Sequence, residues 1–551
     1  MQRKADKLAQ DVFDMVIIGG GVYGLCTAWD ATLRGLKIAV LEKDDFAHAS
    51  SSVNYKLIHG GLRYLQHLDF KRMRISIRER RHMMTMAPHL VSPVEFVVPC
   101  YGHGMKGPEV LWTALQINDL VGFDRNKGID RERRIPRGHL LSREECLRRV
   151  PGLSADGLTG GAVYYDAQMY SAERLALSFG RAAERDGATL INYAEVTGLN
   201  VEGGRVQSAT VRDKVSGRTL TVRGNLFINM TGPWSEITRQ LLHTPQPEHH
   251  VIRSKGVQLF TRSLAECGFT VQTRQVDKTA IIARGGRSLF VTPWRGKSFI
   301  GQSDTIYEGD PDDFEITEQD IAAFLSEFNE AYPAARLTRD DIEYWLGGMI
   351  PVGTDDPNAD AANISHRYEI LDHEKEDGVG NMISVIGVKF TITRYIAEQV
   401  VDRALKKLGR PAAPCSTAKQ KVYGGDIDQV SGAVQAAMAQ HDLDHTTAHH
   451  LVRLYGSEID RVMRYAREHG SLGRHVAGSK EALRAEIVHA VREEMALHVD
   501  DVLIRRSDMG TLGYPGADTV KDVAQLMASE LGWDDDTRRA EIERIRTYYR
   551  V

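Results

Sequence analysis

Cysteine is scarce in this chain, and the few that occur are scattered. Their number is odd, and no two have the spacing of a zinc- or iron-binding pair. This usage suits a reducing compartment rather than a secreted disulfide framework. We therefore predict a cytoplasmic protein without a metal site. The five cysteines are Cys26, Cys100, Cys146, Cys267 and Cys415.

Long apolar runs and an excess of one charge are also lacking. The N-terminus, MQRKADKLAQD, is polar, and no run approaches the roughly 18 apolar residues that cross a bilayer. With 70 basic and 74 acidic residues, the net charge of -4 gives no reason to expect nucleic-acid binding. The basic run from Phe70 to His82 is the exception. It predicts either a solvated helix face or a surface for a membrane or partner.

A βαβ pattern near the N-terminus is the clearest feature that the sequence does contain. A buried strand at Met15–Ile18 leads through a glycine turn into a helix that ends at about Arg34, and a second strand follows at Lys37–Leu41. This pattern, within about 30 residues, is typical of the first unit of a nucleotide-binding sheet.

The turn of that unit carries G-x-G-x-x-G at Gly19, Gly21 and Gly24, and Glu42 ends the second strand. The glycines permit a tight turn, close approach of backbone to a pyrophosphate, and packing of the helix on the strand, while the helix N-terminus favours phosphate charge. Glu42 is placed to bind ribose hydroxyls and disfavours the 2′-phosphate of NADP. The pattern predicts a dinucleotide site.

Two later segments favour FAD over NAD. INMTGPW (Ile228–Trp234) follows a strand and ends in a turn that resembles a second flavoprotein fingerprint beside the pyrophosphate. ISVIGVKFTITR (Ile383–Arg394) places a glycine turn before a helix, whose N-terminus is then directed at the electron-rich part of a reduced isoalloxazine. The sequence therefore predicts FAD as cofactor.

The stretch KLIHGGLRYL (residues 56–65) combines His59, two glycines, Arg63 and Tyr64 in an otherwise apolar segment. It is either a helix start with local polar partners or a backbone that bends around a bound ligand. An arginine suits a phosphate, and a histidine is the best local candidate for a base near neutral pH. His59 has the alternative of being a satisfied interior histidine, and Arg63 of forming a structural ion pair.

With these segments the chain resembles the FAD-dependent glycerol-3-phosphate dehydrogenases and oxidases, within the D-amino-acid-oxidase-like flavoproteins. The segments that carry the resemblance lie in family order and include VIIGGGVYG, LEKDDFAHASSS, KLIHGGLRYLQHLDF, MTGPW, FVTPW, FIGQSDTIYEGDP and GVKFTITR. The resemblance implies oxidation of a phosphorylated secondary alcohol to a ketone, most simply sn-glycerol 3-phosphate to dihydroxyacetone phosphate. Hydride passes to flavin N5, and a quinone or oxygen reoxidises the flavin.

The resemblance also assigns residues. It implies that Arg63, Tyr64 and Lys389 contact the substrate, with Ser303 and Asp304 in a loop above the flavin. The predicted catalytic residues are Arg63, Lys389 and His59, the last chosen by its residue type as the base. The predicted substrate-binding residues are Arg63, Tyr64, Lys389, Ser303 and Asp304. The predicted cofactor-binding residues are Gly19, Gly21, Gly24, Glu42, Ser51, Ser52, Val196, Thr231, Gly232, Gly387, Lys389, Phe390 and Thr391.

The expected fold is α/β: a Rossmann-like FAD-binding domain with an interleaved mixed-sheet substrate domain, plus a C-terminal α-helical cap domain. Prolines at 411 and 414 mark the change to amphipathic helices. We predict a polar segment at 1–11, an oxidoreductase region at 12–410 and the helical domain at 411–551. Within 12–410, the FAD-binding parts are about 12–75, 165–240 and 345–410, and the substrate parts are about 76–164 and 241–344.

The substrate side departs from the family at several positions. Ile350 stands where the family has an arginine, and Asn54, Tyr55, Val388 and Thr393 also differ. An aliphatic side chain cannot bind phosphate, so three hypotheses stay open. The protein oxidises glycerol 3-phosphate with help from Arg253 or Lys255, it oxidises another polyol phosphate, sugar derivative or hydroxy or amino acid, or it binds flavin without turnover.

The sequence leaves four properties open. It does not separate quinone from oxygen as acceptor, and it permits association with the inner face of the cytoplasmic membrane. It does not decide whether His48 links FAD covalently. The C-terminal helices permit a homo-oligomer.

Overall fold

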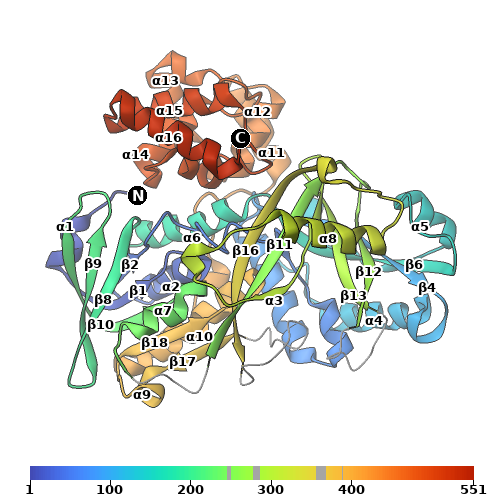
Figure 1. Ribbon diagram of the computed structural model, residues 1–551, viewed down its shortest axis with the longest axis horizontal. Helices are drawn as coiled ribbons and strands as arrows, with labels where there is room; N and C mark the ends of the chain where they lie inside the picture. The colour runs from blue at the N-terminus through green and yellow to red at the C-terminus, as the bar shows by residue number, and fades with distance from the viewer. Residues whose placement is uncertain (245–249, 277–285, 355–367, 388) are drawn as a thin grey trace.

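The computed structural model describes residues 1–244, 250–276, 286–354, 368–387 and 389–551 (Figure 1). Two sheets form its body. The first sheet has the strand order β17-β18-β10-β1-β2-β7, with β8 and β9 continuing from β10. Its strands are β1 (Val12–Ile18), β2 (Ile38–Leu41), β7 (Thr189–Ile191), β8 (Ala194–Glu202), β9 (Arg205–Asp213), β10 (Thr219–Asn229), β17 (Glu369–Asp372) and β18 (Met382–Ile386).

The first sheet is parallel at its centre, where β18, β10, β1, β2 and β7 lie side by side. Its central strands are almost wholly apolar and buried, as is expected when both faces of a parallel sheet are covered. On one face α2 (Val22–Leu33) contacts both α6 (Ala172–Arg185) and α10 (Thr393–Lys407). The predicted βαβ unit is present, and β8, β9 and β10 pair in order as a meander that returns to it.

The second sheet is mixed, and its strands come from two stretches of the chain, residues 57–169 and 250–354. β11 and β16 pair antiparallel over most of their length, and α8 (Glu318–Ala331) packs on β11 and β12. Its strands are β3 (Leu57–Ile58), β4 (Val91–Tyr101), β5 (His139–Leu141), β6 (Leu158–Met169), β11 (His250–Thr261), β12 (Gly268–Val276), β13 (Gly286–Trp294), β14 (Lys297–Gly301), β15 (Thr305–Tyr307) and β16 (Ile342–Thr354).

The predicted boundary at residue 345 is corrected by this pairing. β16 crosses that position and belongs to the second sheet, because its backbone is hydrogen-bonded to β11 along Ile342–Thr354. The chain rejoins the first sheet only at β17. β3 requires a second correction of the predicted domain parts. It lies inside the predicted FAD-binding part but pairs with β6 in the second sheet.

A separate group of helices forms the C-terminal part, drawn in orange to red above the two sheets in Figure 1. Its own apolar core includes Ile487, Val502 and Val523. The helices are α11 (Val430–His441), α12 (His445–Tyr455), α13 (Ile459–Glu468), α14 (Arg484–Glu494), a π-helical turn (Asp501–Arg506), α15 (Ala517–Leu531) and α16 (Asp535–Tyr549). The predicted fold class, with its helical C-terminal domain, is confirmed.

The remaining helices lie around the two sheets. They are α1 (Ala5–Gln10), the 3-10 helix η1 (Leu62–His67), α3 (Phe70–Met86), α4 (Pro108–Val121), α5 (Arg143–Arg149), α7 (Ser235–Gln240) and α9 (His373–Glu376). α1 lies within the segment predicted only as polar and contacts β10.

The basic run of α3 is not wholly a solvated helix face, because three of its arginines form internal ion pairs. Arg80 is buried and its Nη1 donates to Asp166 Oδ1 at 2.6 Å. Arg74 Nη1 donates to Asp124 Oδ1 at 2.6 Å, and Arg81 pairs with the same carboxylate. Much of this positive charge is therefore neutralised by internal ion pairs.

Candidate active site

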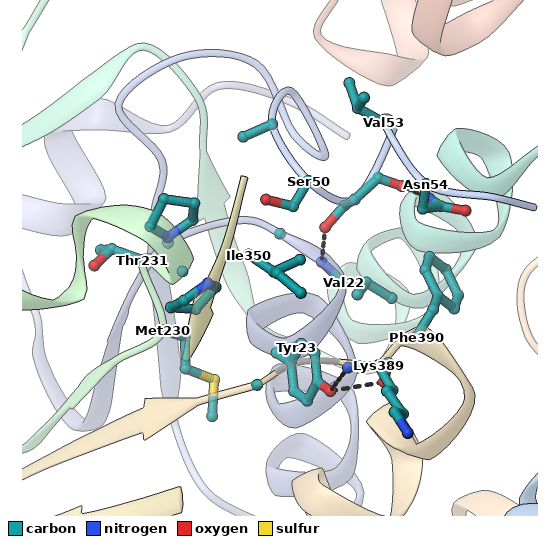
Figure 2. A pocket seen from close by; sticks show the side chains of 18 of the residues that line it. Val22, Tyr23, Ser50, Val53, Asn54, Met230, Thr231, Ile350, Lys389 and Phe390 are labelled. Carbon is teal, nitrogen blue, oxygen red and sulfur yellow. Dashed lines mark hydrogen bonds between the residues drawn. The ribbon is translucent and has the colours of Figure 1, made fainter. Parts of the chain in front are cut away.

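A cavity of about 760 Å³ opens between the two sheets, within the roughly 300–1,000 Å³ of small-molecule and cofactor sites. Its wall comes from segments far apart in sequence: the end of β1, the residues after β2, η1, β13, β16 and the turn after β18. Figure 2 shows this convergence, with Val22 and Tyr23 of α2 facing Ile350 and the Lys389 segment. The edge of a parallel sheet thus meets the second sheet at one site.

The glycine turn forms one end of the cavity. Gly19 has φ of +109°, and a Cβ there would lie 2.5 Å from the carbonyl oxygen of Met230. A Cβ on Gly24 would lie 1.9 Å from the Gly19 oxygen, so this glycine is required for packing of α2 on β1. Val22 N, at the start of α2, donates to Ser51 Oγ at 2.9 Å. The helix N-terminus therefore faces the cavity with hydroxyl and amide groups together.

Glu42 lies beside this turn with its carboxylate held by backbone. Gly20 N donates to Oε2 at 2.6 Å and Asp44 N to Oε1 at 2.9 Å. Burial raises the pKa of Glu42 to about 7, against the lowering effect of the two amide hydrogen bonds. The side chain is placed to accept hydrogen bonds from hydroxyl groups of a ligand in the cavity.

The segment after β18 is fixed to α2 by Tyr23, which the sequence reasoning missed. Tyr23 Oη donates to the Lys389 carbonyl at 2.7 Å, and Lys389 N donates back to Oη at 3.2 Å (Figure 2). A Cβ on Gly387 would lie 2.5 Å from the Tyr23 ring. Burial raises the pKa of Tyr23, so the phenol stays neutral. Its place in the first turn of α2, beside the glycine motif, was the available signal.

Lys389 and η1 form a cationic wall. Lys389 Nζ donates to Tyr64 Oη at 2.6 Å and lies 4.7 Å from the centroid of the Tyr64 ring. Arg63, on the same short helix, also lines the cavity and is exposed. Two cations and a phenol from segments far apart in sequence are thereby gathered on one wall.

His59 lies near this wall and is oriented by Asp166, a residue that sequence reasoning also missed. His59 Nδ1 is 3.0 Å from Asp166 Oδ2, and the imidazole is 44% exposed. Asp166 Oδ1 accepts from Gly60 N at 2.5 Å and from Arg80 at 2.6 Å. Burial would raise the pKa of Asp166, but the hydrogen bond and charge of His59, together with Arg80, hold it below its ordinary value.

Five of the residues considered from the sequence do not line the cavity: Gly24, Ser52, Ser303, Arg253 and Lys255. The Ser52 hydroxyl donates to the His48 carbonyl at 2.9 Å, and Ser303 Oγ accepts from Val257 N at 2.8 Å. Arg253 Nε donates to the Pro233 carbonyl at 2.8 Å, and Lys255 pairs with Asp320 at 2.6 Å. Their polar groups are used within the protein, away from the cavity.

The other predicted residues line the cavity wall. These are Gly19, Gly21, Glu42, Ser51, His59, Arg63, Tyr64, Val196, Thr231, Gly232, Asp304, Gly387, Lys389, Phe390 and Thr391. His48 lies there too, and burial lowers its pKa.

The departures from the family have different structural roles. Tyr55 packs against β13 and β14. Thr292 Oγ1 of β13 donates to its oxygen at 2.8 Å, and a Cβ on Gly301 of β14 would lie 2.3 Å from its ring. Asn54 Nδ2 donates to the Ser51 carbonyl at 2.7 Å within a turn. Ile350 projects into the cavity from β16 (Figure 2). Thr393 is buried outside the cavity, and Val388 lies outside the described residues.

The residues present fit FAD. The glycine turn leaves space that a Cβ would fill, the N-terminus of α2 favours phosphate, and Glu42 offers a carboxylate to ribose. The cavity continues from this end to the cationic wall, which is the arrangement that a dinucleotide extending toward a substrate requires.

Comparison with known proteins agrees with this geometry. Residues 14–402 match the model of the FAD dependent oxidoreductase family, and residues 415–538 match that of the C-terminal domain of alpha-glycerophosphate oxidase. The chain therefore belongs to the FAD-dependent oxidoreductase family, and its cofactor is FAD.

Full-length relatives define the group further. The glycerol-3-phosphate dehydrogenase of Synechocystis is 32% identical, with 99% of this chain and 98% of the relative covered. The alpha-glycerophosphate oxidase of Enterococcus casseliflavus is 27% identical, with 97% and 94% covered. The X-ray structure of a Bacillus halodurans glycerol-3-phosphate dehydrogenase complexed with FAD has the same fold, with a TM-score of 0.77, 24% identity and 98% and 95% coverage. The family resemblance seen in the sequence is confirmed.

Proposed function

We propose that this protein oxidises sn-glycerol 3-phosphate to dihydroxyacetone phosphate. The observation that carries the proposal is the cationic wall of Arg63 and Lys389 beside His59, in the cavity that also holds the glycine turn. A phosphate dianion suits two cations in fixed positions. The full-length similarity to a glycerol-3-phosphate dehydrogenase supports the same substrate.

The chain's residues divide the work of this reaction. Bound FAD supplies the two-electron acceptor, at N5 of its isoalloxazine. Arg63 and Lys389 bind the phosphate, and Tyr64 fixes the Lys389 ammonium. Because Asp166 engages Nδ1 of His59, Nε2 is the nitrogen that accepts the hydroxyl proton of the substrate. The Asp166 carboxylate then stabilises the imidazolium that results.

A second candidate is another polyol phosphate, and Ile350 is the observation that favours it. This residue places an aliphatic group on the cavity wall where the family has an arginine. Tyr55 and Asn54 do not add to this argument, because their polar groups bind backbone. Tyr55 Oη lies 2.6 Å from the Phe290 and Phe299 carbonyl oxygens, and Asn54 Nδ2 donates to the Ser51 carbonyl. A substrate with a longer or less charged end suits such a wall better.

Anaerobic mixing of the FAD-loaded protein with a substrate panel tests the proposal. Glycerol 3-phosphate is expected to bleach the oxidised flavin absorbance within seconds, and a dithionite control gives the full amplitude. If only another polyol phosphate bleaches the flavin, that compound is the substrate and the proposed type of oxidation stands. If no member of the panel bleaches the flavin, the protein binds FAD without this turnover.

We further propose that the electron acceptor is a membrane quinone and that the protein docks on the inner face of the cytoplasmic membrane. No helix of the described residues is long and apolar enough to cross a bilayer. Large apolar side chains are nevertheless exposed just after η1, on α3, on the 3-10 helix η2 (Gly104–Lys106), on α4 and in the loop after α4. α4 contacts η1, α3 and η2, and α3 contacts η1. This apolar surface consists of Leu68, Phe70, Met105, Trp112, Leu120 and Phe123. It adjoins η1, which carries Arg63 and Tyr64 on the cavity wall.

A further inference from the structure

The segment at residues 42–52 forms a large part of the cofactor side of the cavity, yet one of its charges points elsewhere. Glu42, Asp44, His48 and Ser51 line the cavity, whereas Asp45 does not. The Asp45 carboxylate is fully buried. This carboxylate contacts the C-terminal helical domain and not the cavity.

Two consecutive arginines of that domain hold Asp45. Arg506 makes a bidentate contact, with Nη2 2.7 Å from Oδ1 and Nη1 2.8 Å from Oδ2. Arg505 Nε donates to Oδ2 at 2.7 Å, and Asn192 Nδ2 donates to Oδ1 at 3.0 Å. All of these side chains are buried. The two arginines hold the pKa of Asp45 below its ordinary value, although burial alone would raise it.

A second path joins the same two parts. Arg505 Nη2 is 2.5 Å from both Asp500 Oδ2 and Asp501 Oδ1. Asp501 Oδ1 accepts from the Tyr193 hydroxyl at 2.7 Å, and Tyr193 N donates to the Asp44 carbonyl at 2.9 Å. The buried network therefore reaches the segment at two points, the Asp45 carboxylate and the Asp44 carbonyl.

The segment itself has little regular secondary structure to fix it. After β2 the backbone runs through turns and bends, and its ordering depends on such contacts as Ala47 N to the Gly20 carbonyl at 3.0 Å. Ordering a free segment costs conformational entropy, and a segment ordered in advance binds its ligand with less of that cost.

We propose that the C-terminal helical domain positions the FAD-binding segment through Arg505 and Arg506 acting on Asp45. These are positioning residues, because they act through Glu42, Asp44 and their neighbours and do not line the cavity. The cofactor affinity of the protein then depends on docking of a domain that contributes none of the cavity wall among the described residues. The inference goes beyond the substrate proposal and is independent of it.

Asp45→Asn tests this proposal in the FAD-loaded protein. The rate of FAD release, followed by the rise in free-flavin fluorescence after dilution, is expected to increase at least tenfold. Arg506→Gln is expected to do the same, because it removes the other half of the bidentate pair. Binding of ADP to the flavin-free protein, measured by calorimetry, is expected to weaken in parallel, since ADP reports on the adenosine end alone.

Asp508→Asn is the matched control. Asp508 belongs to the C-terminal domain and pairs with Arg295, after β13, at 2.5 Å, so its loss weakens the same domain contact without touching residues 42–52. FAD release from this variant is expected to stay within twofold of the unchanged protein. Equal acceleration in both variants would overturn the proposal, because general loosening of the fold would then explain the effect. Unchanged release from Asp45→Asn would overturn it as well.

Hydrogen exchange supplies a second measurement. Coupling between two sites is reciprocal. If the C-terminal helical domain orders the FAD site, FAD binding must also reduce local opening of that domain. FAD is expected to slow exchange of backbone amides at 495–507 in the unchanged protein and not in Asp45→Asn. Protection confined to residues 12–52 in both proteins would contradict the proposal even if both variants fold poorly.

Discussion

The ammonium nitrogen of Lys389 lies 2.6 Å from the phenol oxygen of Tyr64, although the two residues are 325 positions apart in the sequence. One residue follows the last strand of the first sheet and the other lies on η1. The contact closes one wall of the cavity and holds a long, mobile side chain in one place. A lysine fixed in this way loses less rotamer freedom when an anion binds.

Lys389→Met is expected to raise the KM for glycerol 3-phosphate by about 10- to 100-fold, since a hydrogen bond to a charged group contributes about 1.5–3 kcal/mol. Tyr64→Phe removes only the restraint and should raise KM a few fold. Steady-state kinetics and the bound flavin absorbance measure both effects. FAD content should not change, because Lys389 contacts Tyr23 through its backbone. Loss of FAD from Lys389→Met would instead show that the Lys389 side chain binds the cofactor.

His59→Gln is expected to slow flavin reduction by about 10²- to 10⁴-fold, the usual contribution of a general base. Asp166→Asn should have a smaller effect, because the imidazole remains but its orientation is lost. Single-turnover mixing at several pH values measures both rates. If His59→Gln reduces flavin at the original rate, the imidazole is a structural group of the cavity wall.

Asp166 also predicts a direction for acid stability. Its pKa is lowered in the folded protein, so its ion pairs stabilise the fold above the ordinary carboxyl pKa. That stabilisation is lost as the pH falls through the lowered value. The Asp166→Asn variant should therefore lose less stability on acidification than the unchanged protein, as measured by thermal unfolding from pH 5 down to pH 2.

Glu42 predicts a pH dependence of cofactor binding. Its pKa of about 7 lies above the ordinary value, so the flavin-free protein retains a proton that the unfolded chain has lost between about pH 4.5 and pH 7. In that window the stability of the flavin-free protein falls as pH rises. FAD binding to the ionised carboxylate should tighten about tenfold from pH 6 to pH 8. Fluorescence titration of Glu42→Gln should give a weaker and nearly flat profile; a slope equal to that of the unchanged protein would assign the pH dependence to another group.

Much of the fold could be predicted from local patterns. Gly24 is required by a contact inside one βαβ unit, and such a contact leaves a fixed spacing in the sequence. The predicted boundary assigned most of β16 to the FAD-binding part, because the sequence of an apolar strand does not indicate which sheet it joins. Its partner β11 lies about 90 residues earlier, and only the tertiary pairing decides.

The same reason limits the prediction of the site. Asp166, Tyr23 and Asp45 have their roles through partners from distant segments, and none stands in a motif that points to those partners. Arg253 and Lys255 had the right chemistry, but alternation along β11 turns both side chains away from the cavity.

Ile350→Arg tests whether the altered wall sets substrate preference. A guanidinium on this wall adds a partner for phosphate, so kcat/KM for glycerol 3-phosphate is expected to rise about tenfold. The flavin-free, substrate-free variant should melt at a lower temperature, because the added cation is desolvated without a partner. Ile350→Leu keeps the wall apolar and should change neither quantity. A fall in kcat/KM for Ile350→Arg would favour a larger natural substrate that needs the space.

Leu120 and Phe123 test the membrane proposal, since their side chains are 75% and 79% exposed on the apolar surface. Full burial of one such side chain is worth about 1.5–3 kcal/mol, so replacing both by serine should weaken binding to vesicles at least tenfold. Cosedimentation with vesicles of bacterial lipid measures this, and electron transfer to a quinone in the vesicles should fall in parallel. Transfer to a water-soluble dye should not change, because neither residue lines the cavity. Val215→Ser is the control, since Val215 is 54% exposed on the far turn between β9 and β10. Equal vesicle binding by all three proteins would place the electron acceptor in solution.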